Sequence, residues 1–451
     1  MQKQFAIKIG IIGFITLCLL IPLTMIGGKI YERKNYLYEA EQNVAQSWTG
    51  SQQLMTPIIV QAYEVITLST HRNNDTPTET ATRHLHYIPL DTLTVSADII
   101  TSLRYKGIYS IPVYQATLAI SGKIANKKIQ QHRKAIEEQP GFSRFFKPSI
   151  AVYISDARGV AGKPTLSWMG ETQEVLPGSG LLSLTSGLRS EITLPRPSDE
   201  FLDINVAFQL RGMTSLEFIP AAKNSQFTAQ SNWPHPEFIG AFLPGSRSIN
   251  SEGFISSWQV NEFSSGIDSK LFSCASGNCQ QLLQLGFGAR MYQAVDIYLQ
   301  TERSTKYGIL FIVLCFASFF LFEITRKKAI HPIQYLFVGL ALAIFYLLLI
   351  SLSEHLSFLL AYSLSSSACI ALLFFYIGNL LGGFKASAVF CSALAGLYSL
   401  LYIIIQMEDF ALLMGTLLLF AVLSLVMLST RKIDWYKIGL AKPAASESET
   451  I

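Results

Sequence analysis

The stretch that decides the fold runs from Ile333 to Leu352 and reads IQYLFVGLALAIFYLLLISL. It contains no Asp, Glu, Lys or Arg, and a helix that crosses a bilayer needs about 20 such predominantly apolar residues. Similar apolar stretches lie at Ile9–Ile26, Tyr307–Ile324, Phe358–Ile377, Ala386–Ile405 and Phe410–Leu428. Together they predict six transmembrane helices, one near the N-terminus and five toward the C-terminus.

The first apolar stretch could instead be a cleaved signal peptide. Its apolar region is longer than the roughly 7–15 residues usual for such peptides, and the sequence around Thr24–Gly28 lacks a small-x-small cleavage site. The polar residues from Tyr31 onward read as a helix that continues from the span. We therefore interpret residues 1–29 as an uncleaved membrane anchor.

Composition divides the 451 residues between a soluble part and a membrane part. Half of the chain is hydrophobic and 15% is charged, below the quarter that is typical of soluble domains. Residues 30–305 nevertheless have ordinary polar composition. We predict an anchor (1–29), an inserted domain (30–305), a five-helix bundle (306–430) and a tail (431–451). The net charge of +4 comes without a basic block, so nucleic acid is not an expected partner.

The distribution of Lys and Arg between loops predicts the orientation in the membrane. The loops that contain Arg326-Lys327-Lys328, Lys385 and Arg431-Lys432 are basic, whereas Ser353–His355 and Gln406–Asp409 contain no Lys or Arg. Basic loops face the cytoplasm. The pattern predicts a multi-pass bacterial inner (plasma) membrane protein with both termini cytoplasmic and residues 30–305 in the periplasm.

The inserted domain shows the period-2 alternation of β-strands. The clearest strands are Ile58–Ser69, Arg83–Ile88, Thr92–Ile99 and Ile108–Ser121, and one helix is predicted near Lys127–Glu138. The fold class is therefore a membrane α+β protein. Its large antiparallel, β-rich, sandwich-like periplasmic domain is inserted between transmembrane helices 1 and 2.

The chain carries no motif for phosphate, dinucleotide, zinc-protease or serine-hydrolase chemistry. His84 and His86 alternate on a predicted strand, but a metal site needs at least a third ligand, and we read them as surface histidines. Asp156 and Arg158 suggest either a local ion pair at a turn or a strand-end turn with its charges outward, and we favour the outward charges. We expect no catalytic residues, no metal and no cofactor.

The most distinctive soluble segment runs from Ser231 to Pro244. Pro234 and Pro236 flank His235 and restrict the backbone, while Trp233 and Phe238 supply apolar anchors. Two interpretations stay open: a recognition loop that presents aromatic side chains, and a rigid corner packed against the sheet or the membrane. We favour the packed corner.

Ionisable residues in the bundle are candidates for function because charge in hydrocarbon is costly. Glu323, His331, Glu354 and His355 are the candidates, and all lie near span ends. We interpret them first as interface residues and helix caps. No span carries a charge at its centre, which argues against a proton-driven pump.

Cysteines fall into two groups. Cys274 and Cys279 lie in a Ser/Gly-rich loop that would meet an oxidising periplasm, so we predict a disulfide, with two free thiols as the alternative. Cysteines within apolar stretches behave as small hydrophobic residues; these are Cys18, Cys315, Cys369 and Cys391.

The chain resembles the CreD family of bacterial inner-membrane proteins, described as cell envelope integrity proteins. The resemblance covers nearly the whole length. It rests on Ser231–Phe238, Thr301–Tyr307, His331–Leu340, Ser351–His355, Glu408–Leu413 and Asp434–Tyr436. It implies an inner-membrane location and an association with envelope stress responses and tolerance of cell-wall-directed agents. It implies no reaction and no catalytic residues.

These observations predict a non-enzymatic membrane protein that supports envelope integrity or the envelope stress response through its periplasmic domain. The main alternative is a transporter or lipid-handling protein that uses the five-helix bundle. A third class, an envelope hydrolase, would need a cleft that joins groups such as His235 and Asp156. Membrane lipids are the expected partners, with envelope or cell-wall components as a further class; the sequence identifies no protein partner.

Overall fold

The computed structural model describes residues 2–69, 78–197, 200–291, 297–326, 330–381, 384–406 and 411–431. The chain divides into two compact units. We call Tyr38–Ala294 the β unit, and Met1–Leu37 together with Val295–Ile451 the helical unit. Several residues of the orientation argument lie outside the described residues: Lys327, Lys328, Glu408, Asp409 and Lys432. The predicted tail does too, except Arg431.

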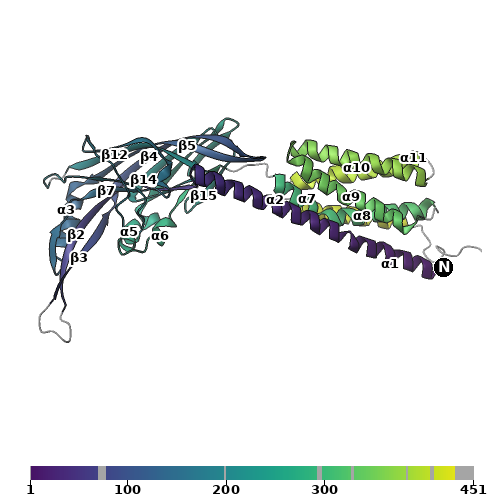
Figure 1. The fold of residues 1–451 in the computed structure, drawn as a ribbon, viewed down its shortest axis with the longest axis horizontal. Coiled ribbons are helices and arrows are strands. Elements are labelled where there is room, and N and C mark those ends of the chain that lie inside the picture. Colours follow the sequence, from purple (N-terminus) through teal and green to yellow (C-terminus); the bar gives the residue numbers. More distant parts are fainter. Residues whose placement is uncertain are drawn as a thin grey trace, which may run out of the picture. The chain divides into compact units, whose positions relative to one another are not determined.

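Apolar helices build the helical unit (Figure 1). Its elements are α1 (Gln2–Cys18), α2 (Leu20–Ser47), α7 (Ile297–Lys306), α8 (Gly308–Arg326), α9 (Pro332–Ser353), α10 (Phe358–Leu381), α11 (Phe384–Gln406) and α12 (Ala411–Thr430). Within the described residues, four helices are long and apolar enough to cross a membrane, and a fifth counts if α7 and α8, bent by 44°, form one span. The last predicted span coincides with α12, an apolar helix of 20 residues. Six spans remain a prediction.

A proline explains the short break between α1 and α2. Pro22 has no N–H to donate to the carbonyl of Cys18, so the helical ladder is interrupted there. Leu19 still donates its N–H to the Ile15 carbonyl at 3.0 Å, and the helix continues to Ser47. The predicted polar continuation of the first span is confirmed.

Close packing fixes this first helix in the helical unit. A Cβ atom on Gly339 of α9 would lie 2.2 Å from a methyl group of Leu19 and 2.9 Å from the Phe316 ring. Only glycine allows such an approach, which is how small residues bring membrane helices together. The first helix therefore packs against α8 and α9.

The β unit contains three sheets. The strands are β1 (Gln52–Met55), β2 (Ile58–Ser69), β3 (Thr78–Ile88), β4 (Leu90–Lys106), β5 (Tyr109–Ala125), β6 (Phe142–Phe145), β7 (Ser149–Tyr153), β8 (Val160–Trp168), β9 (Glu171–Gln173), β10 (Leu176–Pro177), β11 (Gly187–Glu191), β12 (Phe201–Met213), β13 (Ser215–Ile219), β14 (Ala222–Ser231), β15 (Pro236–Gly240), β16 (Ser246–Asn250), β17 (Gly253–Asn261) and β18 (Phe287–Met291). The eight-stranded sheet has the order β16-β17-β14-β4-β5-β12-β8-β9, the six-stranded sheet contains β10-β11-β7-β2-β3 with β6 beside β2, and the four-stranded sheet is β1-β13-β18-β15. Its helices are α3 (Asn126–Glu137), α4 (Glu262–Ser265), α5 (Ile267–Ala275) and α6 (Gln280–Leu283), with a 3-10 turn at Ala157–Gly159.

The prediction of an antiparallel domain needs a correction. Most neighbours are antiparallel, but β4 pairs with β14 and β1 pairs with β13 in parallel. Parallel neighbours require a long crossover connection, which the chain between β4 and β14 supplies. Alternation in one strand does not reveal the direction of a partner so distant in sequence.

The core lies between the inner faces of the sheets. In β4 the side chains of Leu93, Val95, Ala97 and Ile99 are buried while those between them are exposed. They join one buried cluster with residues of the other two sheets, including Ile59. The predicted strand Ile58–Ser69 matches β2, and the predicted helix near Lys127–Glu138 matches α3.

The structure joins Cys274 and Cys279, in α5 and just before α6, by a disulfide with 4.1 Å between their Cα atoms. Both residues are buried beside Leu271 and Leu282. We predict that the thiols are oxidised in the mature protein and that the bond adds about 2 kcal/mol, since the closed loop is short. Mass spectrometry after alkylation without reductant should find both cysteines unmodified by the reagent. Full alkylation of both would contradict the prediction.

Candidate functional site

The predicted interaction loop forms a corner of the four-stranded sheet. Pro236 is the first residue of the edge strand β15, a position where the missing N–H costs no ladder bond. Trp233 and Phe238 are half-buried and pack against the core; the Phe238 ring lies 5.8 Å from the rings of both Phe254 and Trp258. This geometry fits the packed-corner interpretation. His235 is exposed in the corner, as are Asn232 and Glu237.

The predicted polar residues of the bundle form two separate groups at the two ends of α9. Glu323 and His331 lie at its N-terminal end, Glu354 and His355 at its C-terminal end. The helix has 22 residues, so the groups are separated by roughly 33 Å. They do not line one shared site.

Glu323 is the centre of the first group. Lys8 of α1 forms an ion pair with it, and the Tyr335 hydroxyl donates a hydrogen bond to its carboxylate at 2.9 Å. The side chains of Lys8 and Glu323 are only 19% and 13% exposed. His331 caps α9 by accepting from the backbone N–H of Ile333 at 3.3 Å. Both residues thus have structural partners.

In the second group, Glu354 faces Arg33 of α2 across 3.1 Å, and its side chain is 8% exposed. His355 is exposed in the turn after α9. Sequence reasoning identified the acidic residues but not their cationic partners, because Lys8 of α1 and Arg33 of α2 lie more than 300 residues away from them in the chain.

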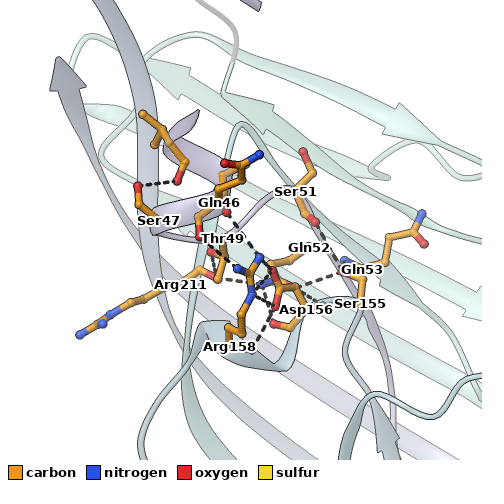
Figure 2. Close-up of polar contacts among 12 residues, drawn as sticks. Gln46, Ser47, Thr49, Ser51, Gln52, Gln53, Ser155, Asp156, Arg158 and Arg211 are labelled. Atoms are coloured by element: carbon orange, nitrogen blue, oxygen red, sulfur yellow. Dashed lines mark hydrogen bonds and ion pairs between the residues drawn. The ribbon is translucent and has the colours of Figure 1, made fainter. Parts of the chain in front are cut away.

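A polar clamp lies where α2 ends (Figure 2). The Arg158 guanidinium binds both carboxylate oxygens of Asp156, at 2.9 and 2.6 Å, and donates to the carbonyl of Gln46 at 3.1 Å. A cation suits the last carbonyls of a helix. This hydrogen-bonded guanidinium also lowers the pKa of Asp156. The ion pair, which was the less favoured of the two interpretations, is present, and Arg158 also binds the end of a helix.

Trp48 completes the attachment of the helix end. The guanidinium carbons of Arg104 and Arg211 lie over its ring, 4.1 and 4.8 Å from a ring centroid. Beside it, Ala40 and Val44 are buried against residues of β5 and β12. Sequence reasoning missed this site, since its members come from three distant segments without a shared motif.

The hydrolase alternative gains no support from these contacts. The Asp156 carboxylate forms an ion pair with Arg158, and His235 is an exposed residue of the proline-flanked corner. Within the described residues, no three His, Cys, Asp or Glu side chains are placed to hold a metal ion. His84 stacks on Tyr63 with 5.5 Å between ring centroids, whereas His86 bonds to His132 across 2.9 Å.

The His86–His132 pair predicts a pH dependence of stability. Burial, and then the neighbouring His132, lower the pKa of His86 to about 4. An unfolded histidine protonates near pH 6.5, so between these values the unfolded chain binds more protons and folding stability falls as the pH falls. Allowing for partial exposure, we expect a loss of roughly 1–2 kcal/mol from pH 6.5 to 4. Melting curves should show a smaller loss in His86→Gln; identical profiles would contradict the assignment.

A groove of ≈ 650 Å³ lies within the helical unit along α2, beside α7 and α8. It is larger than two hollows of ≈ 300 and ≈ 380 Å³ over strands of the β unit. Four aliphatic side chains line it, together with polar and charged ones; the aliphatic residues are Leu20, Leu23, Ile30 and Ile309. Gly27 leaves space in its wall, because no atom lies within 4 Å of a Cβ built there.

One end of the groove is charged. Glu302 of α7 forms ion pairs with Lys34 and with Lys306, the latter at 2.9 Å. The groove therefore runs from an apolar end to a cationic end, which can hold an amphiphile. The sequence alone did not reveal it, because the two lysines come from helices that meet only in the folded chain.

Comparison with known proteins gives one extended similarity. A family model described as "Inner membrane protein CreD" matches residues 4–436. The inner membrane protein CreD of Escherichia coli (strain K12) is 33% identical over 439 residues, which cover 96% of this chain and 94% of that protein. Two solved structures of an M1 zinc metallopeptidase from Deinococcus radiodurans match at 6% and 7% identity over 38% of each chain, with a TM-score of 0.19. So low a score supports no argument about fold or activity.

Proposed function

As the chain belongs to the CreD family of inner membrane proteins, we propose that it supports cell envelope integrity as a non-enzymatic protein. In this proposal the β unit acts in the periplasm, and the helical unit crosses the membrane six times with both termini cytoplasmic. The observation that carries the proposal is the attachment of α2. This helix leaves the apolar anchor without a polar linker and ends in the β unit, held by Arg158 and Trp48.

The ion pairs of the helical unit support the proposed topology. Lys8, before the first span, pairs with Glu323 at the end of α8, and Arg33, after the first span, pairs with Glu354 at the end of α9. The start of the first span and the end of the second thus share one side. In the sequence, Arg326-Lys327-Lys328 comes directly after the end of this second span, and such basic loops face the cytoplasm, as a cytoplasmic N-terminus requires.

The β unit can make contacts through its proline-flanked corner. His235 is exposed there, while Trp233 and Phe238 pack inward and hold the backbone in place. We propose that this corner contacts an envelope or cell-wall component through the exposed His235. Preorganised loops lose little conformational freedom on binding.

Complementation tests this role. In a strain that lacks the gene, His235→Ala should reach wild-type abundance and melting temperature but fail to restore tolerance of a cell-wall-directed agent. Arg247→Ala, on the exposed edge strand β16, is the matched control and should restore tolerance fully. Full complementation by His235→Ala would remove the corner from the proposal.

A second candidate function is lipid handling by the helical unit. The observation that favours it is the groove along α2, which combines an apolar wall with a cationic end. Two glutamates of the bundle, Glu323 and Glu354, form ion pairs near the ends of α8 and α9. Glu323 and Glu354 therefore serve packing in this proposal rather than transport.

A further inference from the structure

We propose that the groove along α2 binds one anionic phospholipid, with its phosphate at Lys34 and Lys306 and an acyl chain along Leu20 and Leu23. The inference rests on the lipid-handling candidate and deepens it, and it is independent of the contact role proposed for the β unit.

The length of the groove matches one leaflet. Its lining runs along α2 from Leu20 to Lys34, which is about 21 Å at 1.5 Å per residue. Half of a bilayer with its headgroups is about 20–22 Å thick. The volume of ≈ 650 Å³ lies within the roughly 300–1,000 Å³ of small-ligand sites. A phospholipid therefore fits the groove along its length.

The apolar end of the groove suits a hydrocarbon chain. Leu23 and Ile30 form a buried floor, 6% and 2% exposed. The hydroxyl of Thr24 donates to the Ile21 carbonyl at 2.8 Å, so this polar group of the wall is already satisfied within its own helix. Thr305, which also lines the groove, donates its hydroxyl to the Thr301 carbonyl at 2.9 Å. An acyl chain would therefore leave neither threonine hydroxyl without a partner.

The cationic end of the groove suits an anionic headgroup. Lys34 and Lys306 share the single carboxylate of Glu302, which leaves one positive charge among the three groups. The Lys306 side chain is 70% exposed and can reach a phosphate oxygen. A lipid with a net negative headgroup gains from this charge, whereas a zwitterionic headgroup brings its own ammonium group.

Two adjacent glycines provide a matched pair of variants. Gly27 lines the groove and Gly28 does not, and neither has an atom within 4 Å of a Cβ built on it. Gly27→Leu should fill the groove without strain in the helix, and Gly28→Leu should leave it open. The full chain in detergent would be titrated with dioleoyl phosphatidylglycerol and dioleoyl phosphatidylcholine, and bound lipid counted by native mass spectrometry.

We expect the wild-type chain to retain one phosphatidylglycerol about five-fold more tightly than phosphatidylcholine. Gly27→Leu should lose this lipid, and Gly28→Leu should keep it. Lys306→Gln should weaken phosphatidylglycerol binding about five-fold, whereas Glu302→Gln, which removes the competing carboxylate, should strengthen it by a similar factor. Lys29→Gln is the charge control, because Lys29 pairs with Glu32 outside the groove.

Equal retention of phosphatidylglycerol by Gly27→Leu and Gly28→Leu would overturn the proposal. So would equal affinity of the wild-type chain for the two lipids. Because the readout is bound lipid, failure here leaves the envelope role of the β unit standing, and failure of the His235 complementation test leaves the lipid site standing.

Discussion

Glu323→Ala is expected to destabilise the helical unit by about 2–4 kcal/mol, because it leaves the largely buried ammonium group of Lys8 without its counter-charge. It also removes the acceptor for the Tyr335 hydroxyl. The loss should appear as lower abundance in membranes and a lower melting temperature in detergent.

A double variant separates structure from function at this position. Replacing a buried pair by apolar residues is often neutral or stabilising. Lys8→Met with Glu323→Leu should therefore recover abundance and restore envelope tolerance. If the double variant is abundant and stable but does not complement, Glu323 has a functional role, and the transporter alternative would replace the structural account.

Trp48→Ala should cost about 2–4 kcal/mol in the β unit. The substitution removes a large ring packed beside Ala40 and Val44 and two stacked guanidinium contacts, from Arg104 and Arg211. Thermal melting of the purified full chain measures the loss. Limited proteolysis should show new cleavage between α2 and β1, because the helix end is released.

Trp48→Phe is the matched control, since it retains an aromatic ring in contact with the two guanidinium groups. It should lose less than half as much stability and resist the new cleavage. An unchanged melting curve for Trp48→Ala would mean that the end of α2 is held by Arg158 alone, or by neither contact.

Local patterns in the sequence predicted the elements well. Alternation located β2 at its observed bounds, and apolar length located α9 and α10 to within a few residues. Both signals depend only on neighbours along the chain. The parallel pairing of β4 with β14 was not predictable in this way, because hydrophobic alternation is the same for both strand directions.

The sequence patterns could not predict sites whose residues come from distant segments of the chain. An ion pair between Asp156 and Arg158 was considered, because the two residues are close in sequence, although it was not the favoured interpretation. The Gln46 carbonyl that Arg158 also binds was not considered. The groove was missed for the same reason: Lys34 and Lys306 acquire a shared role only when α2 and α7 pack together. The proline corner was the exception: the sequence left recognition and packing open and favoured packing, and Trp233 and Phe238 do pack against the core.

Topology is the most direct test of the central claim, that the β unit acts outside the inner membrane. Fluorescent-protein fusions that are active only in the cytoplasm would be made after Phe201 in the β unit and after Lys328, beyond α8. The account predicts fluorescence from the Lys328 fusion and none from the Phe201 fusion at comparable protein levels, with the reverse for alkaline phosphatase. Cytoplasmic fluorescence from the Phe201 fusion would contradict the periplasmic placement and with it the proposed function.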